Sequence, residues 1–290
     1  MRIWKSRLYW LALPALALPA LAQAPAQQPA ALPDWVTIER NIPYDKYPET
    51  VLDILQPRTS AAGRRPGAMV IHGGGWTGGS KERVVTNFCL PYLEKGFVVA
   101  NVEYRLAKSA PAPAAVSDVL NAAAWFRRNA GRYRVDPRRI VVTGGSAGGH
   151  LALMVGLATK QARLGPPAEV AAVINFYGIT DVNDQLEGAN MRKYAVTWVP
   201  EQAGRIELAR RVSPLTYVRR KAPPVLTIHG DADETVPYEH GVQLTRALRE
   251  AGADAEMISV PQGKHGFAKE KLDELYPQIF EFLKRRKILD

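Results

Sequence analysis

One short segment, residues 139–150, limits the possible folds of this chain more than any other part of its sequence. A β-branched run at 140–143 leads into the glycine- and alanine-rich turn 144–148, and a helix-like apolar run begins at Leu151. Small residues at positions 144 and 148 let a chain leave a strand, reverse sharply and enter a helix. The pattern therefore predicts a strand–turn–helix unit that holds Ser146 exposed at the edge of a sheet. Because Gly-x-Ser-x-Gly is short and also occurs in ordinary turns, the flanking strand and helix carry this prediction.

Hydrophobic runs alternate with helix-patterned segments along most of the chain. The first two predicted strands are joined by a turn at 44–46, as expected for a hairpin. Later strands are short and continuously apolar, which is typical of strands buried on both faces of a parallel sheet. Strands are predicted at 35–42, 50–55, 68–71, 97–102, 140–143, 170–176, 225–228 and 256–260, and helices at 88–95, 113–130, 151–155, 238–251 and 271–285. This order predicts an α/β fold with a mostly parallel eight-stranded sheet and helices on both faces.

The N-terminus differs in kind from the rest of the chain. Three basic residues precede an apolar run at 8–21, and small residues follow it, which is the layout of a cleaved secretory signal. A membrane anchor is the alternative, but the run is short for a bilayer span and two prolines interrupt it. We predict a signal peptide at 1–22, a flexible leader at 23–33 and one domain at 34–290. The mature protein is then expected to be secreted or periplasmic, without a membrane span.

Composition excludes several other classes of protein. The single cysteine, Cys89, excludes an intrachain disulfide and a metal site built from cysteines. The net charge of +10 falls to +7 without the three basic residues of the predicted signal, because 35 Lys and Arg then face 28 Asp and Glu. No stripe of basic residues interleaved with aromatics accompanies this charge, so nucleic-acid binding is not expected.

An irregular stretch at 179–217 interrupts the alternation after the sixth predicted strand. It is too long for a simple connection, and long insertions in compact folds tend to be lids or binding loops. We therefore predict a lid-like insertion there. The alternative is a pair of surface helices without any part in binding.

Ser146 can act as a nucleophile only with a suitable base. A serine hydroxyl reacts poorly at neutral pH and needs a base within hydrogen-bonding reach, itself oriented by an acid. In a sheet of this kind the acid and then the base follow later strands. His265 lies in the flexible loop after the last predicted strand and is the expected base. The other histidines suit the role less: His72 and His150 are out of order, His229 is predicted to be structural, and His240 is predicted to face solvent.

The orienting acid is expected in the turn at 230–237, which follows the strand at 225–228. Three carboxylates, those of Asp231, Asp233 and Glu234, are available there, and loop position alone favours none of them. Asp231 could instead cap the turn, and Glu234 could face solvent or the next helix.

Backbone donors for a developing oxyanion are expected at two places. Consecutive glycines after the strand at 68–71 would let N–H groups converge on a small anion, and the N–H after the serine would complete the set. The alternative is a tight turn with positive φ, for which one glycine would suffice. The predicted donors are Gly73, Gly74, Gly75 and Ala147.

From about residue 44 to the C-terminus, the chain resembles the α/β-hydrolase fold, and within it the serine esterases marked by His-Gly-Gly-Gly. It is similar to the hormone-sensitive-lipase-like group and to the bacterial feruloyl and acetyl esterase-like branch. The landmarks are Leu52-Asp53-Ile54-Leu55-Gln56-Pro57, residues 72–76, Tyr104-Arg105-Leu106, residues 144–148, the His-Gly-x-x-Asp-x-x-Val-Pro pattern at 229–237, and His265-Gly266-Phe267. The resemblance assigns the acid to Asp233. Strands at the N-terminus, in place of a helical cap, are more similar to the second branch.

The resemblance implies a carboxylic-ester hydrolase that works through an acyl-enzyme and needs no metal or cofactor. Members of the second branch often act on acylated plant polysaccharides or small aryl esters. Bulky residues near Ser146 are expected to line the substrate pocket and to favour short acyl groups; they are Trp76, Tyr104, Tyr177, Trp198, Val236 and Phe267, each also plausible as core. Two other functions stay open: a serine peptidase or formamidase on the same fold, and a non-catalytic carbohydrate-binding module.

Overall fold

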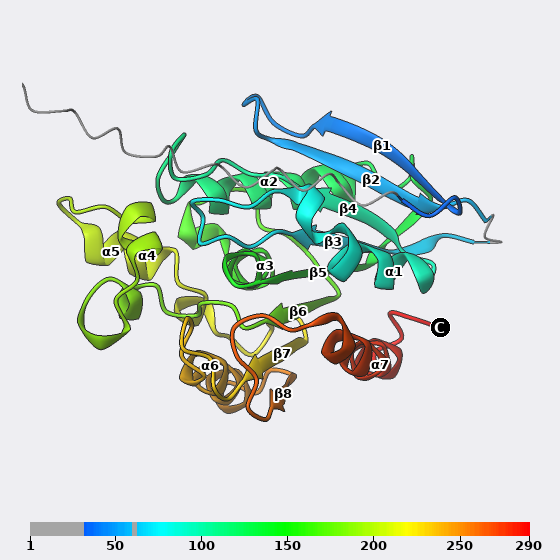
Figure 1. Ribbon diagram of the computed structural model, residues 1–290. Helices are drawn as coiled ribbons and strands as arrows, with labels where there is room; N and C mark the ends of the chain where they lie inside the picture. The colour runs from blue at the N-terminus through cyan, green and yellow to red at the C-terminus, as the bar shows by residue number, and fades with distance from the viewer. Residues whose placement is uncertain (1–31, 60–62) are drawn as a thin grey trace, which may run out of the picture.

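The computed structural model describes residues 32–59 and 63–290. Its centre is one eight-stranded sheet in the order β1-β2-β4-β3-β5-β6-β7-β8, which runs from top to bottom in Figure 1. The strands are β1 Val36–Pro43, β2 Val51–Pro57, β3 Arg65–Ile71, β4 Val98–Val102, β5 Val135–Gly145, β6 Ala172–Phe176, β7 Val225–Gly230 and β8 Ala255–Val260. Strands β3 to β8 are parallel, whereas β1 pairs antiparallel with β2, and β2 with β4. The predicted α/β fold and hairpin are confirmed.

Helices cover both faces of this sheet. The α-helices are α1 Leu90–Glu94, α2 Ala114–Arg128, α3 Ala147–Leu157, α4 Lys193–Trp198, α5 Arg205–Arg211, α6 Glu239–Glu250 and α7 Lys269–Arg285. Short turns of other helix types are η1 Lys81–Val84, η2 Val85–Cys89, η3 Lys160–Ala162, η4 Asn183–Gln185, η5 Gly188–Asn190 and η6 Pro214–Tyr217. Residues of α2, α3 and α6 share one apolar core, and residues of α1 and α7 share the other. The two layers lie on opposite sides of the strands (Figure 1).

The central strands are mostly apolar in sequence because they are buried on both faces. Every residue of β4, β6 and β7 is buried, because helices cover each strand on both faces. Edge strand β1, by contrast, is mostly half-buried or exposed. The two apolar faces of the sheet therefore hold the C-terminal ends of β3, β5, β7 and β8 in fixed positions.

Several element boundaries differ from the predictions, among them those of β5 and of the helix predicted at 88–95. Strand β5 begins at Val135 instead of residue 140, because Val135 pairs with Arg65 before the register shifts and Ile140 pairs with Gly67. The helix predicted at 88–95 is split into the π-helical turn η2 and the short helix α1, which has a proline in its first turn. Neither change moves the end of a strand that carries a predicted site residue.

The predicted insertion lies between β6 and β7 and contains η4, η5, α4, α5 and η6. Apart from these short helices it is irregular, as expected. The predicted signal peptide and nearly all of the predicted leader lie outside the described residues. Within residues 32–59 and 63–290, no helix is both long and apolar enough to cross a membrane.

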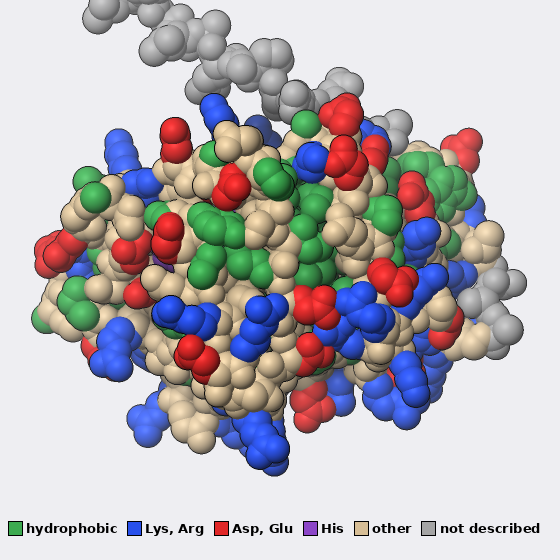
Figure 2. Space-filling model, turned by 90° about the horizontal axis from the view of Figure 1, so that it is seen from below, with side chains coloured by type: hydrophobic (Ala, Val, Ile, Leu, Met, Phe, Trp, Pro, Cys, Tyr) green, Lys and Arg blue, Asp and Glu red, His purple; other side chains and the backbone are tan. Residues whose placement is uncertain are grey.

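Charges of both signs are mixed on the surface. Figure 2 shows Lys and Arg side chains interspersed with Asp and Glu side chains on the face seen from below. Between α7 and β8, for example, Arg285 lies 2.8 Å from Glu256 and Arg286 lies 2.6 Å from Asp254. Such pairing neutralises part of the net positive charge locally.

Candidate active site

Ser146 stands at a strained turn between β5 and α3. Its backbone has φ 58° and ψ −125°, a conformation that L-residues rarely adopt and that clusters at functional sites. Close packing explains the glycines around it, because a Cβ on Gly144 or Gly148 would lie 2.4 or 2.2 Å from the carbonyl oxygen of Ile71. The turn at Ser146 therefore packs directly against the end of β3.

His265 lies within hydrogen-bonding reach of this serine, and Asp233 within reach of His265. Nε2 of His265 is 3.0 Å from Oγ of Ser146, and its Nδ1 is 2.8 Å from Oδ2 of Asp233. Asp231 and Glu234, the other candidate acids, are exposed, and Asp231 instead accepts a hydrogen bond from the backbone N–H of Gln262. Of the three carboxylates left open by the sequence, the structure brings Asp233 to the histidine.

Asp233 is held as a carboxylate. Burial alone would raise its pKa, but hydrogen bonds with His229 and His265 and from the backbone outweigh burial and lower the pKa well below its usual value. Oδ1 accepts the N–H groups of Thr235 and Val236, at 2.8 and 2.9 Å. Oδ2 is left to face the two imidazoles.

His229 is buried beside this carboxylate. Its Nε2 lies 3.0 Å from the carbonyl oxygen of Val236 and 3.4 Å from Oδ2 of Asp233. The structural role predicted for His229 is compatible with these contacts, which support the acid. The contact between His229 and Asp233 was not predicted.

The prediction that His240 faces solvent is wrong. His240 is buried, and its Nδ1 lies 3.1 Å from the backbone N–H of Thr180 while its Nε2 lies 3.1 Å from Oδ2 of Asp184. Burial lowers its pKa, although Asp184 opposes this. Residues of the insertion cover the start of α6, where the local sequence suggested an exposed position.

The other two histidines are buried and make contacts within the protein interior. His150 is fully buried, and burial lowers its pKa to about 4. Its Nε2 lies 2.7 Å from the carbonyl oxygen of Val212, and its Nδ1 accepts the indole N–H of Trp76 at 3.2 Å. His72 stacks on Tyr104, with ring centroids 4.3 Å apart.

Backbone conformation or close packing requires glycine at each of the three positions after β3. Gly74 and Gly75 have φ of 116° and 58°, and a Cβ on Gly73 would lie 2.7 Å from the carbonyl oxygen of Gly145 and 3.5 Å from Cβ of Ser146. The argument that one glycine would suffice for the turn is therefore wrong. Gly73 nevertheless lies beside Ser146, so the backbone of this loop approaches the serine. Ala147 is the first residue of α3, so its N–H has no intrahelical partner.

His72 orients the first peptide of this loop. Its Nδ1 lies 2.8 Å from the carbonyl oxygen of Gly73, and its Nε2 lies 2.7 Å from Oε1 of Glu103. A trans peptide directs its C=O and N–H in opposite directions. The contact with the Gly73 carbonyl therefore turns the N–H of Gly74 away from His72.

Of the six predicted substrate-pocket residues, Tyr177 contacts His265, and Phe267 packs on Tyr177. Tyr177 packs its ring 4.9 Å from that of His265 and 5.2 Å from that of Phe267, which is partly exposed. The expectation is wrong for the other four, which have no exposed surface and belong to the core: Trp76, Tyr104, Trp198 and Val236. Trp76 and Trp198, for example, stack with centroids 4.1 Å apart.

The insertion contributes a residue that the sequence analysis missed. Tyr194, on α4, is half-buried, and a Cβ on Gly75 would lie 2.8 Å from both Cβ and Cγ of the tyrosine. Burial raises the pKa of Tyr194 to about 12. Its aromatic character within a predicted lid was the available signal, but nothing in the local sequence indicates a contact with Gly75.

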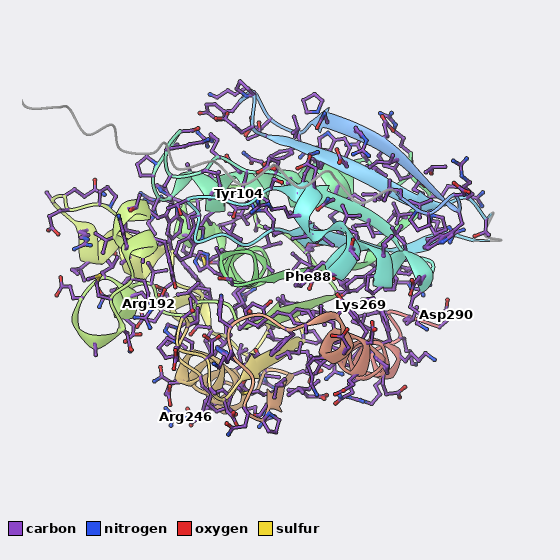
Figure 3. The ribbon with its side chains drawn as sticks, in the orientation of Figure 1. Phe88, Tyr104, Arg192, Arg246, Lys269 and Asp290 are labelled. Atoms are coloured by element: carbon purple, nitrogen blue, oxygen red, sulfur yellow. The ribbon has the colours of Figure 1, made fainter. Side chains whose placement is uncertain are left out.

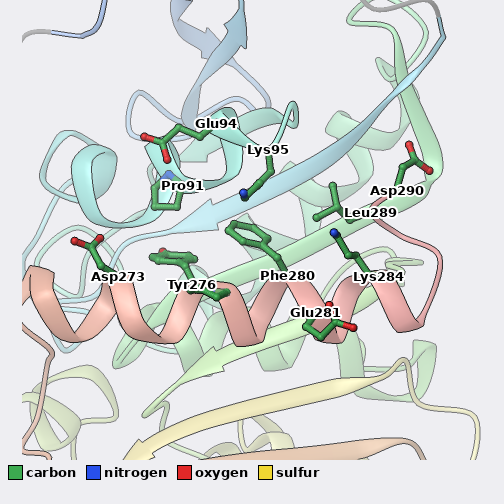
Figure 4. Close-up of a pocket in the computed structure, with 11 residues that line it drawn as sticks. Pro91, Glu94, Lys95, Asp273, Tyr276, Phe280, Glu281, Lys284, Leu289 and Asp290 are labelled. Carbon is green, nitrogen blue, oxygen red and sulfur yellow. The ribbon is translucent and has the colours of Figure 1, made fainter.

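A separate groove of about 570 Å³ lies between α1 and α7 (Figure 4). Apolar residues such as Tyr276 and Phe280 line it together with charged ones such as Glu94 and Lys284. None of Ser146, Asp233 and His265 is among the residues around it. Within the described parts of the chain, no group of three or more His, Cys, Asp and Glu residues could hold a metal ion.

Known proteins with similar sequences and structures identify the family of this chain. The family model of BD-FAE matches residues 52–248, which is more than half of the sequence. The chain belongs to the BD-FAE family. This confirms the resemblance to the feruloyl esterase-like branch of the α/β-hydrolases. The matched range contains Ser146 and Asp233 but ends before His265.

Curated relatives include two proteins of Mycobacterium tuberculosis. Esterase LipQ is 31% identical over 76% of this chain and 54% of its own length. Esterase LipC is 30% identical over 79% of this chain and 59% of its own length. The chain thus spans little more than half the length of these relatives.

Solved structures extend the likeness over most of the chain. A truncated carbohydrate esterase from gut microbiota has a TM-score of 0.76 and 27% identity, covering 91% of this chain and 99% of that one. A thermophilic esterase from Thermogutta terrifontis has a TM-score of 0.72 and 27% identity, covering 88% of this chain and 94% of that one. The BD-FAE member therefore shares its architecture with known esterases.

Proposed function

We propose that this protein is a carboxylic-ester hydrolase that forms an acyl-enzyme on Ser146. The observation that carries this proposal is the continuous chain from Oγ of Ser146 to Nε2 of His265 and from Nδ1 of His265 to Asp233, at 3.0 and 2.8 Å. His265 accepts the serine proton as Oγ attacks the ester carbonyl, and then delivers that proton to the leaving alcohol. Water attacks the acyl-enzyme in the second half-reaction, with His265 again as base.

The negative charge on the carbonyl oxygen is stabilised by backbone N–H groups beside Ser146. We assign these donors to Gly73, Gly74 and Ala147, with Gly75 as an alternative to one of the glycines. A single donor of this kind contributes about 3 kcal/mol to transition-state stabilisation. The chemistry needs no metal and no cofactor.

The proposed substrates are short-chain acyl or aryl esters, with acetyl or feruloyl groups on plant polysaccharides as the natural candidates. The family and the carbohydrate esterase among its structural relatives support this range. The Thermogutta esterase has also been solved with propionate and with butyrate bound. Short acyl groups therefore fit at least one related site.

The test is a substrate panel measured with the wild type and with Ser146→Ala. Short p-nitrophenyl esters, methyl ferulate and acetylated xylan are compared with an aminoacyl-p-nitroanilide. The proposal predicts ester hydrolysis that Ser146→Ala abolishes. Faster cleavage of the anilide would favour a peptidase or amidase, and glycan binding without any hydrolysis would favour a carbohydrate-binding module.

We further propose that residues 1–22 direct export and are removed, leaving one hydrolase domain at 34–290 in the periplasm or outside the cell. The basic, apolar and small-residue segments of the N-terminus support this. N-terminal sequencing of protein recovered from the periplasm or the medium tests it. A start after Ala22 is expected, and an uncleaved N-terminus would contradict it.

A further inference from the structure

The insertion between β6 and β7 is fastened to the loop that carries Asp233. The carbonyl oxygen of Thr235 lies 3.1 Å from Nε2 of Gln185, 3.0 Å from Nε of Arg192 and 3.4 Å from Oη of Tyr194. Figure 3 labels Arg192 where the insertion approaches α6 and the strands beside it. Three side chains of the insertion thus converge on one carbonyl, two residues after Asp233.

Further contacts hold the same insertion in place. His240 contacts Asp184 and the backbone of Thr180, as described above. Trp198, at the end of α4, stacks on Trp76 directly after the three glycines. These contacts fasten the insertion to α6 and to the loop after β3.

Tyr194 connects the loop after β3 with the loop after β7. Its Cβ and Cγ pack against the backbone of Gly75, whereas its hydroxyl reaches the carbonyl oxygen of Thr235 and donates to Oε1 of Gln185 at 2.9 Å. The ring therefore extends from the loop that contains Gly75 to the loop that carries Asp233. Gly73, two residues before Gly75, lies against Ser146.

Other aromatic residues lie beside Gly145 and His265. A Cβ on Gly145 would lie 2.9 Å from Oη of Tyr177, whose ring also contacts those of His265 and Phe267. The leaving alcohol must lie beside Nε2 of His265 to take its proton. Tyr177 packs on His265 and Phe267, whereas Tyr194 packs on Gly75 and reaches the loop that carries Asp233.

We propose that Tyr194 is the residue that limits acyl-chain length in this enzyme. This inference rests on the proposed esterase function and deepens it by assigning the acyl side of the site to one side chain. The tyrosine ring occupies space that a longer acyl chain would need. Its hydroxyl contacts keep the ring in that position.

The experiment compares kcat/KM for p-nitrophenyl esters from acetate to octanoate across variants of the full chain. Tyr194→Ala is expected to raise the octanoate-to-acetate ratio by about tenfold or more, in the range that a few methylene groups contribute in an apolar pocket. Tyr194→Phe keeps the ring and should keep the wild-type ratio within about twofold. Tyr217→Ala is the matched control, because Tyr217 lies in the same insertion and bonds the carbonyl of Arg211 instead.

The outcomes separate this inference from the proposed function. An unchanged ratio in folded Tyr194→Ala, with an active wild type and an inactive Ser146→Ala, overturns the role of Tyr194 alone. A similar rise in Tyr217→Ala also overturns it, because the effect would then come from general loosening of the insertion. If Tyr194→Ala fails to fold, Tyr194→Leu replaces it under the same criterion. An inactive wild type overturns the proposed function itself.

Discussion

Nε2 of His265 lies 3.0 Å from Oγ of Ser146, although 119 positions separate the two residues in the sequence. The serine follows β5 and the histidine follows β8, and two strands lie between these in the sheet. Three interstrand spacings amount to roughly 14 Å, so the loop after β8 must reach back across the sheet edge. The contact therefore depends on the pairing of β5, β6, β7 and β8.

The buried acid should be essential for turnover. We predict that Asp233→Asn lowers kcat for p-nitrophenyl acetate by about 10⁴-fold with little change in KM, because an amide favours the wrong tautomer of the base. Asp231→Asn is the control, since this residue is exposed and its carboxylate accepts a hydrogen bond from the backbone N–H of Gln262, not from His265. A loss below about tenfold in Asp233→Asn would argue against its role.

Burial of His150 should make stability depend on pH. Its pKa is lowered from 6.5 to about 4 in the folded protein, so only the unfolded chain binds a proton between these values. Stability must therefore fall as the pH drops through this window, by about 3 kcal/mol from this group. Urea unfolding between pH 7 and pH 4 should show a correspondingly shallower loss in His150→Gln, which cannot titrate. Parallel pH profiles of the two proteins would contradict the prediction.

Trp198 should be important for stability and not for substrate contact. It is fully buried and stacks on Trp76, so Trp198→Ala removes a large core side chain and should cost about 3–5 kcal/mol. Trp35→Ala is the control, because Trp35 is 37% exposed and should change stability by less than about 1 kcal/mol. Chemical denaturation measures both. Equal effects would show that burial does not separate these tryptophans.

Glycine at position 148 should be required by packing. A Cβ there would lie 2.2 Å from the carbonyl oxygen of Ile71, so Gly148→Ala forces β3 and α3 apart and should cost about 1–3 kcal/mol or more. At Gly131 a Cβ would meet nothing within 4 Å, so Gly131→Ala should be tolerated. Thermal unfolding of the pair measures the difference. A Gly148→Ala protein as stable as Gly131→Ala would contradict the predicted clash.

The sequence sufficed to predict the sheet and the three residues Ser146, Asp233 and His265, which are joined by hydrogen bonds. Strands such as β4 and β6 are buried on both faces and therefore read as apolar runs whatever the rest of the chain does. Ser146, Asp233 and His265 each follow a strand, and the ends of parallel strands meet at one edge. Their positions after parallel strands therefore indicated that they lie close together. The choice of Asp233 among three carboxylates came from the family resemblance.

The surroundings of the site could not be predicted in the same way. An aromatic residue beside a motif, such as Trp76, has the same local sequence whether it faces substrate or core. Tyr194 and His240 acquire their positions through contacts with Gly75, Thr180 and Asp184, which depend on how an irregular insertion folds over the sheet. Periodic patterns carry no information about such contacts.

The central claim is that Ser146 becomes acylated. Its most direct test is peptide mapping by mass spectrometry after reaction with a fluorophosphonate, a reagent that modifies activated serines. We predict one adduct, on the peptide that contains Ser146, absent from Ser146→Ala and much slower to form in His265→Ala. Hydrolysis of p-nitrophenyl acetate by the same preparation with no adduct at Ser146, or with the adduct on another residue, would contradict the account.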